Sequence, residues 1–166
     1  MQDRIDPIKD LIMPLTDVLL PDAVIPALKA GSKKQALQEL SEHAARLSGL
    51  PEREIFDALL QRERLGSTGI GNGIAIPHGK MAKVDKLVGV FARLDKPIDF
   101  ESLDGEPVDL IFLLLAPETA GADHLKALSR VARTMRDPAI AQKLRMTKEA
   151  PALYALLTQS PTASAA

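Results

Sequence analysis

A single histidine, His78, stands between Pro77 and Gly79 at the end of a stretch with four glycines in eight positions, Gly66 to Gly73. A neutral imidazole nitrogen is a nucleophile near pH 7, because its ordinary pKa is about 6.5. It can attack a phosphoryl group without a separate base to deprotonate it. The chemistry that these residues favour is therefore phosphoryl transfer through a phosphohistidine at His78.

A phosphoryl group on His78 needs hydrogen-bond donors around its oxygens, and the glycine-rich stretch offers several. Glycine allows positive φ and lets backbone amides approach an anion closely. We therefore expect a phosphate-binding loop made of the hydroxyls of Ser67 and Thr68 and the amides of Gly69, Gly71 and Gly73.

Two further residues are candidates for the same site. Arg62 lies seven residues after Ile55 and three after Leu59, so it continues the buried stripe of a helix and is expected to point inward near the helix end. Asp123 is a plausible N-cap, which places His124 in the first turn of a later helix. The helix dipole there disfavours a protonated ring, and a neutral His124 could donate a hydrogen bond to the phosphoryl oxygens.

Each of these residues also has a purely structural interpretation. His78 could stabilise a Gly-Pro turn, Arg62 could be a surface arginine, and His124 could be solvated at a helix start. Ser67 and Thr68 could hold the turn through bonds from side chain to backbone. Without their context, the residues do not decide between these roles.

Other binding motifs fail on spacing or on residue type. The glycines lack the third position of a dinucleotide fingerprint, and Gly79-Lys80 follows Gly73 after five residues where a P-loop has four. Two histidines far apart, without a carboxylate signature, are weak evidence for zinc, and the chain has no cysteine. We expect neither a metal nor another cofactor.

Composition limits the classes of protein that fit. With 166 residues, 46% of them hydrophobic, the chain is expected to form one domain over 1–166, with a core over about 8–158 and a flexible tail at 160–166. A net charge of -1 gives no reason to expect nucleic acid. No apolar run approaches a membrane span of about 20 residues. The lack of cysteine and of a visible signal peptide is compatible with a cytoplasmic protein.

Hydrophobic periodicity predicts an α/β domain with helices on both faces of a sheet. The clearest pattern predicts a helix over about 33–48, which begins after Ser32 and ends at Gly49. His43 lies on the apolar stripe of this helix and is expected to be packed and hydrogen-bonded. The other expected helices run from Pro51 towards Gly66, from Asp123, from Asp137-Pro138 to about Thr147, and from Pro151 to Gln159. The expected strands are 23–28 at an edge, 74–76, 87–94 and a central 108–116, with turns over 95–107 and a tight turn at Asp104-Gly105.

The site residues resemble the active-site signature of the fructose/mannitol class of phosphotransferase-system IIA proteins, most of all its nitrogen-regulatory branch. The similarity extends from about Ile8 to Leu157. The residues that carry it are Arg62-Glu63, the unbroken Gly66-Ser67-Thr68-Gly69-Ile70-Gly71-Asn72-Gly73-Ile74-Ala75-Ile76-Pro77-His78-Gly79-Lys80, Ser32-Lys33-Lys34 and Asp123-His124-Leu125.

This resemblance implies a mixed sheet flanked by helices, the mannitol-type IIA fold. It implies that His78 is phosphorylated through Nε2, and that Arg62 and His124 match the family's arginine and second histidine. The donor would be a histidine phosphocarrier protein, itself charged by enzyme I and phosphoenolpyruvate, so the chain would be a phosphotransferase. Nitrogen-regulatory members dock on potassium transporters, sensor kinases and other regulators in a phosphorylation-dependent way.

Three functional hypotheses remain open on the sequence. The chain could be a phosphocarrier, or a regulatory docking protein in which phosphate beside exposed Ile74, Ile76 or Met81 blocks an apolar contact. It could also be a stand-alone sugar-specific IIA component that passes phosphate to a IIB cysteine.

Overall fold

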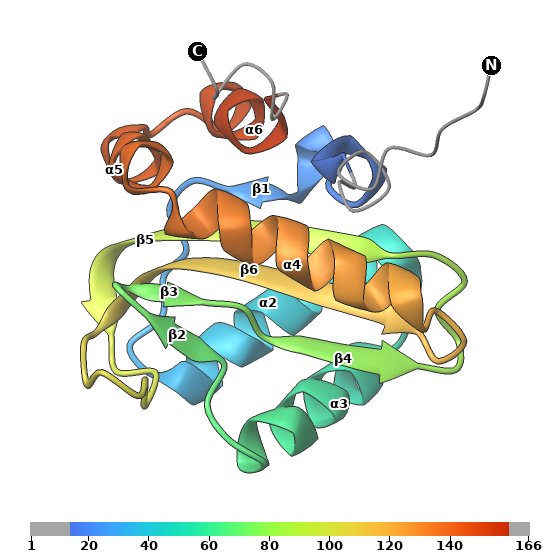
Figure 1. Cartoon of the computed structure of the whole chain (residues 1–166). Coiled ribbons are helices and arrows are strands. Elements are labelled where there is room, and N and C mark those ends of the chain that lie inside the picture. The colour runs from blue at the N-terminus through green and yellow to red at the C-terminus, as the bar shows by residue number, and fades with distance from the viewer. Residues whose placement is uncertain (1–13, 160–166) are drawn as a thin grey trace, which may run out of the picture.

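A six-stranded mixed sheet covered by helices on both faces makes up residues 14–159, the part of the chain that the computed structural model describes (Figure 1). The strands are β1 (Val24–Ile25), β2 (Gly69–Gly71), β3 (Ile74–Ala75), β4 (His78–Met81), β5 (Val88–Ile98) and β6 (Val108–Pro117). The helices are α2 (Lys33–Ser48), α3 (Glu52–Arg64), α4 (Ala122–Arg136), α5 (Pro138–Met146) and α6 (Ala150–Thr158), and the 3₁₀ turns η1 (Leu15–Asp17) and η2 (Pro21–Ala23) precede β1. The α/β class is confirmed. The expected start of the core near residue 8 and the tail at 160–166 lie outside the described residues.

Strand β6 is the centre of the sheet, as its near-continuous apolar run predicts. The strand order is β1-β5-β6-β3-β2, and β4 also pairs with β6. Strand β5 is antiparallel to β6, whereas β3 and β4 are both parallel to it, with Ile74 opposite Leu110 and His78 opposite Leu114. The short β1 pairs only with β5, so its predicted edge position is confirmed. The sheet therefore attaches His78 directly to its most buried strand.

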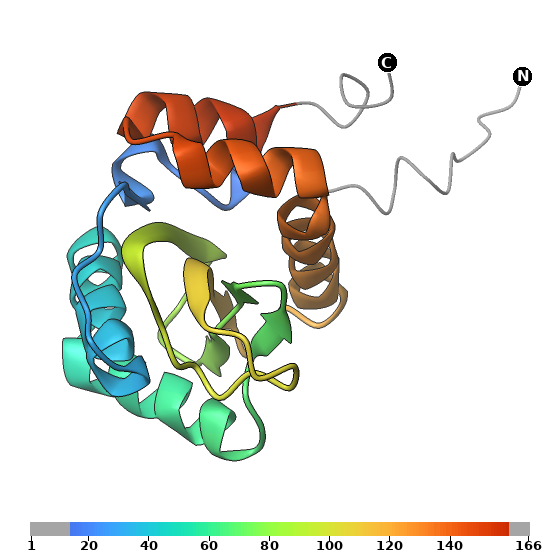
Figure 2. The same cartoon turned by 90° about the vertical axis from the view of Figure 1, so that its left-hand side faces the viewer.

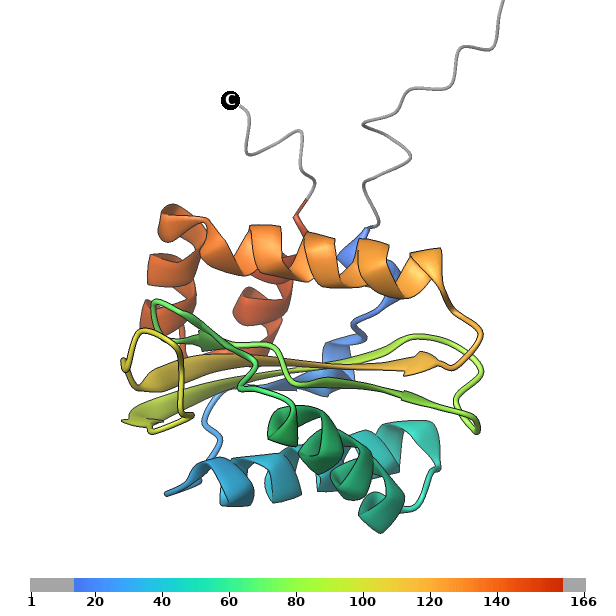
Figure 3. The same ribbon diagram turned by 60° about the horizontal axis from the view of Figure 1, so that its bottom comes forward.

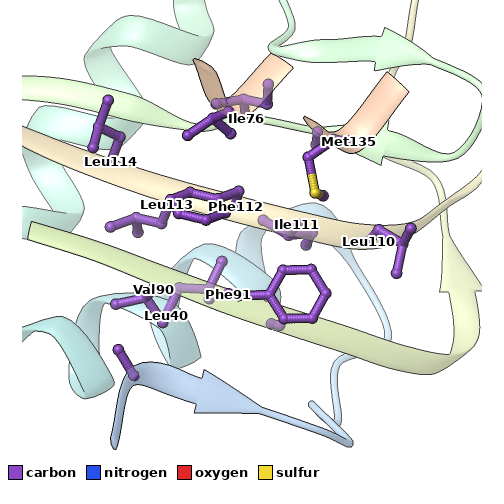
Figure 4. Packing of buried hydrophobic residues seen from close by; sticks show 14 of the residues in the cluster. Leu40, Ile76, Val90, Phe91, Leu110, Ile111, Phe112, Leu113, Leu114 and Met135 are labelled. Carbon is purple, nitrogen blue, oxygen red and sulfur yellow. The ribbon is translucent and has the colours of Figure 1, made fainter. Parts of the chain in front are cut away.

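The helices form a layer on each face of this sheet. Helices α2 and α3 pack across one face and α4 runs along the other, with α5 and α6 beside β1 (Figures 2 and 3). The core between the layers contains Phe91 and Phe112 on adjacent strands, both fully buried, with Leu40 of α2 on one side and Met135 of α4 on the other (Figure 4). Burial of these apolar side chains is the main force that holds the three layers together.

Helix ends follow local capping chemistry in two of the predicted cases. The hydroxyl of Ser32 accepts a hydrogen bond from the amide of Gln35 at 3.1 Å, and Gly49 ends α2 in the left-handed region at φ 77°. The carboxylate of Asp137 likewise accepts from the amide of Ala139 at 3.0 Å at the start of α5. These boundaries were predictable because each signal lies within a few residues of the end that it defines.

Several predicted boundaries are wrong. Strand β1 covers only Val24–Ile25 of the expected 23–28. Helix α4 begins at Ala122 with Gly121 as N-cap, so Asp123 lies inside the first turn and caps nothing. The φ of 52° at Gly121 lets the chain enter the helix before Asp123. Strand β5 also continues to Ile98 instead of ending at Leu94, because Ile98 resumes pairing with Val108 after an irregularity in the ladder.

The central strand gives a direct test of this fold. Leu113 of β6 is fully buried, and its truncation in Leu113→Ala should lower the free energy of unfolding by about 2–5 kcal/mol, through lost transfer energy and a residual cavity. Denaturant unfolding measures the loss. The control Leu103→Ala, at a side chain that is 93% exposed, should change it by less than about 0.5 kcal/mol.

Candidate functional site

Both ring nitrogens of His78, at the start of β4, have partners. Nδ1 lies 2.8 Å from the carbonyl oxygen of Ile76, and Nε2 lies 3.3 Å from Nε of Arg62. A carbonyl oxygen only accepts hydrogen bonds and a guanidinium only donates them, so Nδ1 must carry the proton and Nε2 must present a lone pair. The ring is therefore a neutral imidazole whose free nucleophilic atom is Nε2.

The surroundings of His78 also favour its neutral form. Burial lowers the pKa of His78 below its ordinary value, and the nearby charge of Arg62 acts in the same direction. The hydrogen bond to Ile76 and the carboxylate of Glu63 act to raise the pKa but do not reverse the shift. Near pH 7 the ring is unprotonated at Nε2.

Arg62 lies in the last turn of α3, where helical spacing from Ile55 and Leu59 predicts it to face the interior. Its Nη1 donates to the carbonyl oxygen of Gly66 at 3.0 Å while its Nε faces His78. The guanidinium is thus held at two points, one on the chain that follows the helix and one on the imidazole.

His124 lies in the first turn of α4, which covers the opposite face of the sheet from α3 (Figure 3), and its ring reaches the same site. Its ring centroid lies 5.7 Å from that of His78, with an interplanar angle of 50°. The side chain is only 7% exposed, and Nδ1 is buried without a hydrogen-bond partner among residues 14–159. Burial, His78 and Lys80 all lower the pKa of His124, so this ring is neutral as well. The structure brings His78, Arg62 and His124 together.

The hydroxyls of Ser67 and Thr68 lie close to this group in the chain but are already engaged. Ser67 donates to the carbonyl oxygen of Phe100 at 2.7 Å and accepts from the amide of Gly69 at 3.0 Å. Thr68 donates its hydroxyl and its amide to the carboxylate of Glu63. Both side chains hold the connection between α3 and β2.

The remaining glycines form a β-hairpin, and the structure does not bring its tip to His78. Asn72 and Gly73 occupy the turn with φ of 57° and 80°, the signs that a two-residue type I′ turn requires. The carbonyl of Gly73 accepts from the amide of Leu110, whereas His78 pairs with Leu114, about 13 Å farther along β6 at the usual rise per residue. Gly71 pairs with Ile74 next to the turn. The positive φ that suggested an anion-binding loop serves the hairpin instead.

Glu63 and Lys33 belong to the surroundings of the site; the sequence analysis names both for the family resemblance but assigns neither a role. Glu63 is buried beside Arg62, and Lys33 lies 3.0 Å from its Oε1. The available signal was helical spacing, because Glu63 follows the buried Leu59 by four positions and so lies on the inner face of α3.

Exposure of the apolar residues differs from expectation. Ile74, Ile76 and Met81 are buried, at 1%, 4% and 8% exposure, because their side chains belong to the hydrophobic core. Two exposed apolar side chains lie near site residues in the chain: Leu65, at 85%, three residues after Arg62, and Leu125, at 66%, directly after His124. His43 is half-buried and hydrogen-bonded to Arg46, so the predicted hydrogen bond is confirmed and its burial is partial.

Within residues 14–159, no group of three or more histidine, cysteine, aspartate or glutamate side chains is arranged to hold a metal ion. Of the helices in that range, none has the length and apolar character to cross a membrane.

The chain belongs to the family described as phosphoenolpyruvate-dependent sugar phosphotransferase system, EIIA 2, whose model matches residues 17–160. Within this family it is similar to nitrogen regulatory proteins. The nitrogen regulatory protein of Bradyrhizobium diazoefficiens is 61% identical over 153 residues, which are 92% of this chain and 100% of that protein. The crystal structure of the nitrogen regulatory protein IIA-Ntr from Neisseria meningitidis superposes with a TM-score of 0.83 at 38% identity, covering 87% of this chain and 99% of that one.

The IIA mannitol protein of Escherichia coli shares the fold, with a TM-score of 0.70 at 24% identity over 82% of this chain and 96% of that one. These comparisons confirm both the resemblance to the nitrogen-regulatory branch and the mannitol-type fold.

The protonation of His78 can be measured directly. We expect NMR titration to give a pKa below the ordinary histidine value, with the proton of the neutral ring on Nδ1. Arg62→Ala should raise this pKa, because it removes a cation that disfavours the charged ring. A pKa that falls or stays constant in Arg62→Ala would contradict the contact between the two side chains.

The hairpin turn should be separable from the site. A Cβ added at Gly73 would approach Nη2 of Arg145 at 2.6 Å and Oδ1 of Asp109 at 2.9 Å, at a φ that side chains rarely adopt. Gly73→Ala should therefore lower the free energy of unfolding by about 1–3 kcal/mol and leave the titration of His78 unchanged. Urea unfolding and NMR test both halves, and a shifted His78 pKa would place the turn closer to the site than we find.

Proposed function

We propose that the chain is a phosphocarrier of the nitrogen-regulatory IIA type, which accepts a phosphoryl group on Nε2 of His78 from a histidine phosphocarrier protein. The observation that carries this proposal is the pair of contacts on His78, Nδ1 to Ile76 and Nε2 to Arg62. These contacts select the tautomer with the proton on Nδ1, in which the lone pair of Nε2 faces the guanidinium of Arg62. Catalysis of phosphoryl transfer consists mainly of such positioning and charge stabilisation.

In the proposed reaction, the lone pair of Nε2 attacks the phosphorus in line with the bond to the donor nitrogen. The new P–N bond forms as the donor's P–N bond breaks, and the electron pair of the broken bond returns to the donor imidazole. No proton moves in this step. Arg62 then loses its acceptor on Nε2 and its Nε–H becomes free to face the phosphoryl oxygens. The hydrogen bond from Nδ1 to Ile76 stabilises the positive charge that the ring gains.

His124 has a supporting role in this proposal. Its ring is neutral and its centroid lies 5.7 Å from that of His78, so it is close enough to contact a phosphoryl group carried by His78. A neutral imidazole can donate one hydrogen bond to that group without the desolvation cost of a buried cation. We leave Gly71 and Gly73 out of the proposed phosphate site, because Gly71 pairs with Ile74 in the hairpin and Gly73 lies in its turn.

The proposed output is regulation of nitrogen and potassium metabolism in the cytoplasm through phosphorylation-dependent docking, for example on potassium transporters or sensor kinases. Similarity to nitrogen regulatory proteins supports this over a sugar-specific role. A phosphoryl group adds about -1.5 to -2 charges. Leu65, three residues after Arg62, and Leu125, directly after His124, are exposed apolar residues whose contacts such a charge would disturb.

Reconstituted phosphoryl transfer from phosphoenolpyruvate through enzyme I and the histidine phosphocarrier tests the assignment. The wild-type chain should take up an acid-labile, base-stable label, and His78→Ala should take up none. Arg62→Ala should slow labelling by about one to two orders of magnitude, because a hydrogen bond to a charged group contributes about 1.5–3 kcal/mol. The control His43→Ala should label normally, since His43 contacts Arg46 on α2. Label on His78→Ala would reject the assignment.

A further inference from the structure

A closed ring of polar contacts adjoins Arg62 and joins four separate parts of the chain. We call it the Glu63 ring. Its members are Lys33 of α2, Glu63 of α3, Ser67 and Thr68 of the connection to β2, and Phe100 and Glu101 of the loop between β5 and β6.

Glu63 is the centre of this ring and is almost completely desolvated. Its side chain is 3% exposed. Oε1 accepts from the amide of Thr68 at 3.0 Å and lies 3.0 Å from Nζ of Lys33, and Oε2 accepts from the hydroxyl of Thr68. A buried carboxylate persists only when it is paired and hydrogen-bonded in this way.

Lys33 closes the ring on the opposite side. Its Nζ lies 3.3 Å from Oε1 of Glu101 and 4.9 Å from the ring centroid of Phe100. The carbonyl of Phe100 accepts from the hydroxyl of Ser67, which leads back to Thr68. Glu101 has a φ of 58°, uncommon for a residue with a side chain, so this loop is held in a strained conformation.

The segment that the ring holds is the one that positions Arg62. Residue Gly66 directly precedes Ser67 and Thr68, and its carbonyl is the acceptor for Nη1 of Arg62. Its amide also donates to the carbonyl of Glu63 at 3.0 Å. A shift of this segment would move the Gly66 carbonyl and release the guanidinium from His78.

We propose that Glu63 is a positioning residue for the reaction at His78, because through Thr68 and Lys33 it holds the segment whose Gly66 carbonyl directs Arg62 towards Nε2. That a reaction occurs at His78 rests on the proposed function above. The effect of Glu63 on the position of Arg62 does not depend on it. Glu63 contacts neither the imidazole nor a transferred group, and its effect passes through Arg62.

A direct electrostatic effect of Glu63 would have the opposite sign. The Glu63 carboxylate raises the pKa of His78, and Arg62 lowers it more strongly. Loss of the carboxylate charge alone would therefore lower the pKa of His78. Displacement of Arg62 away from His78 would instead raise the pKa of His78. The two roles are separated by the direction in which the pKa moves.

NMR titration of His78 in four variants tests the positioning. Thr68→Val removes the hydroxyl bond to Glu63 without changing any charge, and Glu63→Gln removes the pairing with Lys33. Both should raise the pKa of His78. Thr68→Ser, which keeps the hydroxyl, should leave it near the wild-type value, as should Glu54→Gln, a control on the same helix at an exposed pair with Lys83. Thermal unfolding verifies that each variant is folded.

An unchanged pKa in both Thr68→Val and Glu63→Gln would overturn the proposal. A lowered pKa in Glu63→Gln would assign Glu63 a direct charge effect and overturn it too. If Glu63→Gln does not fold, Thr68→Val decides the question, because valine keeps the shape of threonine.

A double-mutant cycle measures the consequence for catalysis. With the histidine phosphocarrier as donor, Glu63→Gln should slow phosphoryl transfer about tenfold at saturating donor and leave the KM unchanged, because only positioning is lost. In an Arg62→Ala background, Glu63→Gln should cause little further loss, since its effect requires Arg62. Losses that add fully would overturn the proposal. If no donor phosphorylates the chain while the titration follows the expected pattern, the proposed function fails and the positioning role stands.

Discussion

The hydrogen bond from Nδ1 of His78 to the carbonyl of Ile76 determines what the site can do, because it fixes which nitrogen keeps its lone pair. This bond depends on a short break in the sheet. Ile76 and Pro77 lie between β3 and β4, and both strands pair in parallel with β6. The carbonyl of Ile76 therefore lies outside the ladder and is available to the ring two residues later. The orientation of the nucleophile follows from how the backbone crosses this break.

The charges around His78 are balanced rather than simply positive. Arg62 provides a cation next to Nε2, but Glu63 follows it in the chain and is buried. An unpaired carboxylate there would oppose the arrival of a phosphoryl dianion. Its pairing with Lys33 and its hydrogen bonds from Thr68 keep it satisfied at a distance from the imidazole. The same contacts that neutralise Glu63 also give the chain around Gly66 its shape.

Much of the framework was predictable because its signals are local or periodic. The caps of α2 and α5 lie beside the ends they define, and the apolar run of β6 is typical of a central strand. Helical spacing also placed Arg62 on the inner face of α3, and the position of His124 in a first turn was correct even though its helix begins earlier than expected.

The glycine-rich stretch shows where sequence reasoning reaches its limit. Positive φ at Asn72 and Gly73 suits an anion-binding loop or a type I′ hairpin, and the Asn-Gly pair is a local signal that favours the hairpin. The partners that decide between them are Asp104, which accepts from the amide of Asn72, and Arg145, which donates to its carbonyl. Both partners are remote in the chain, at separations of 32 and 73 residues, so local sequence can suggest the turn but not the contacts that fix it.

The hairpin turn and the His78 site lie at different ends of the sheet, and different constraints act on the residues at each end. Its turn is fastened to Asp104 and Arg145, about 13 Å along β6 from the imidazole. Substitutions in the turn are limited by its backbone geometry and by the ion pair between Asp109 and Arg145. They are not limited by the positions of the groups around His78. The turn can therefore be redesigned for stability without displacing the nucleophile.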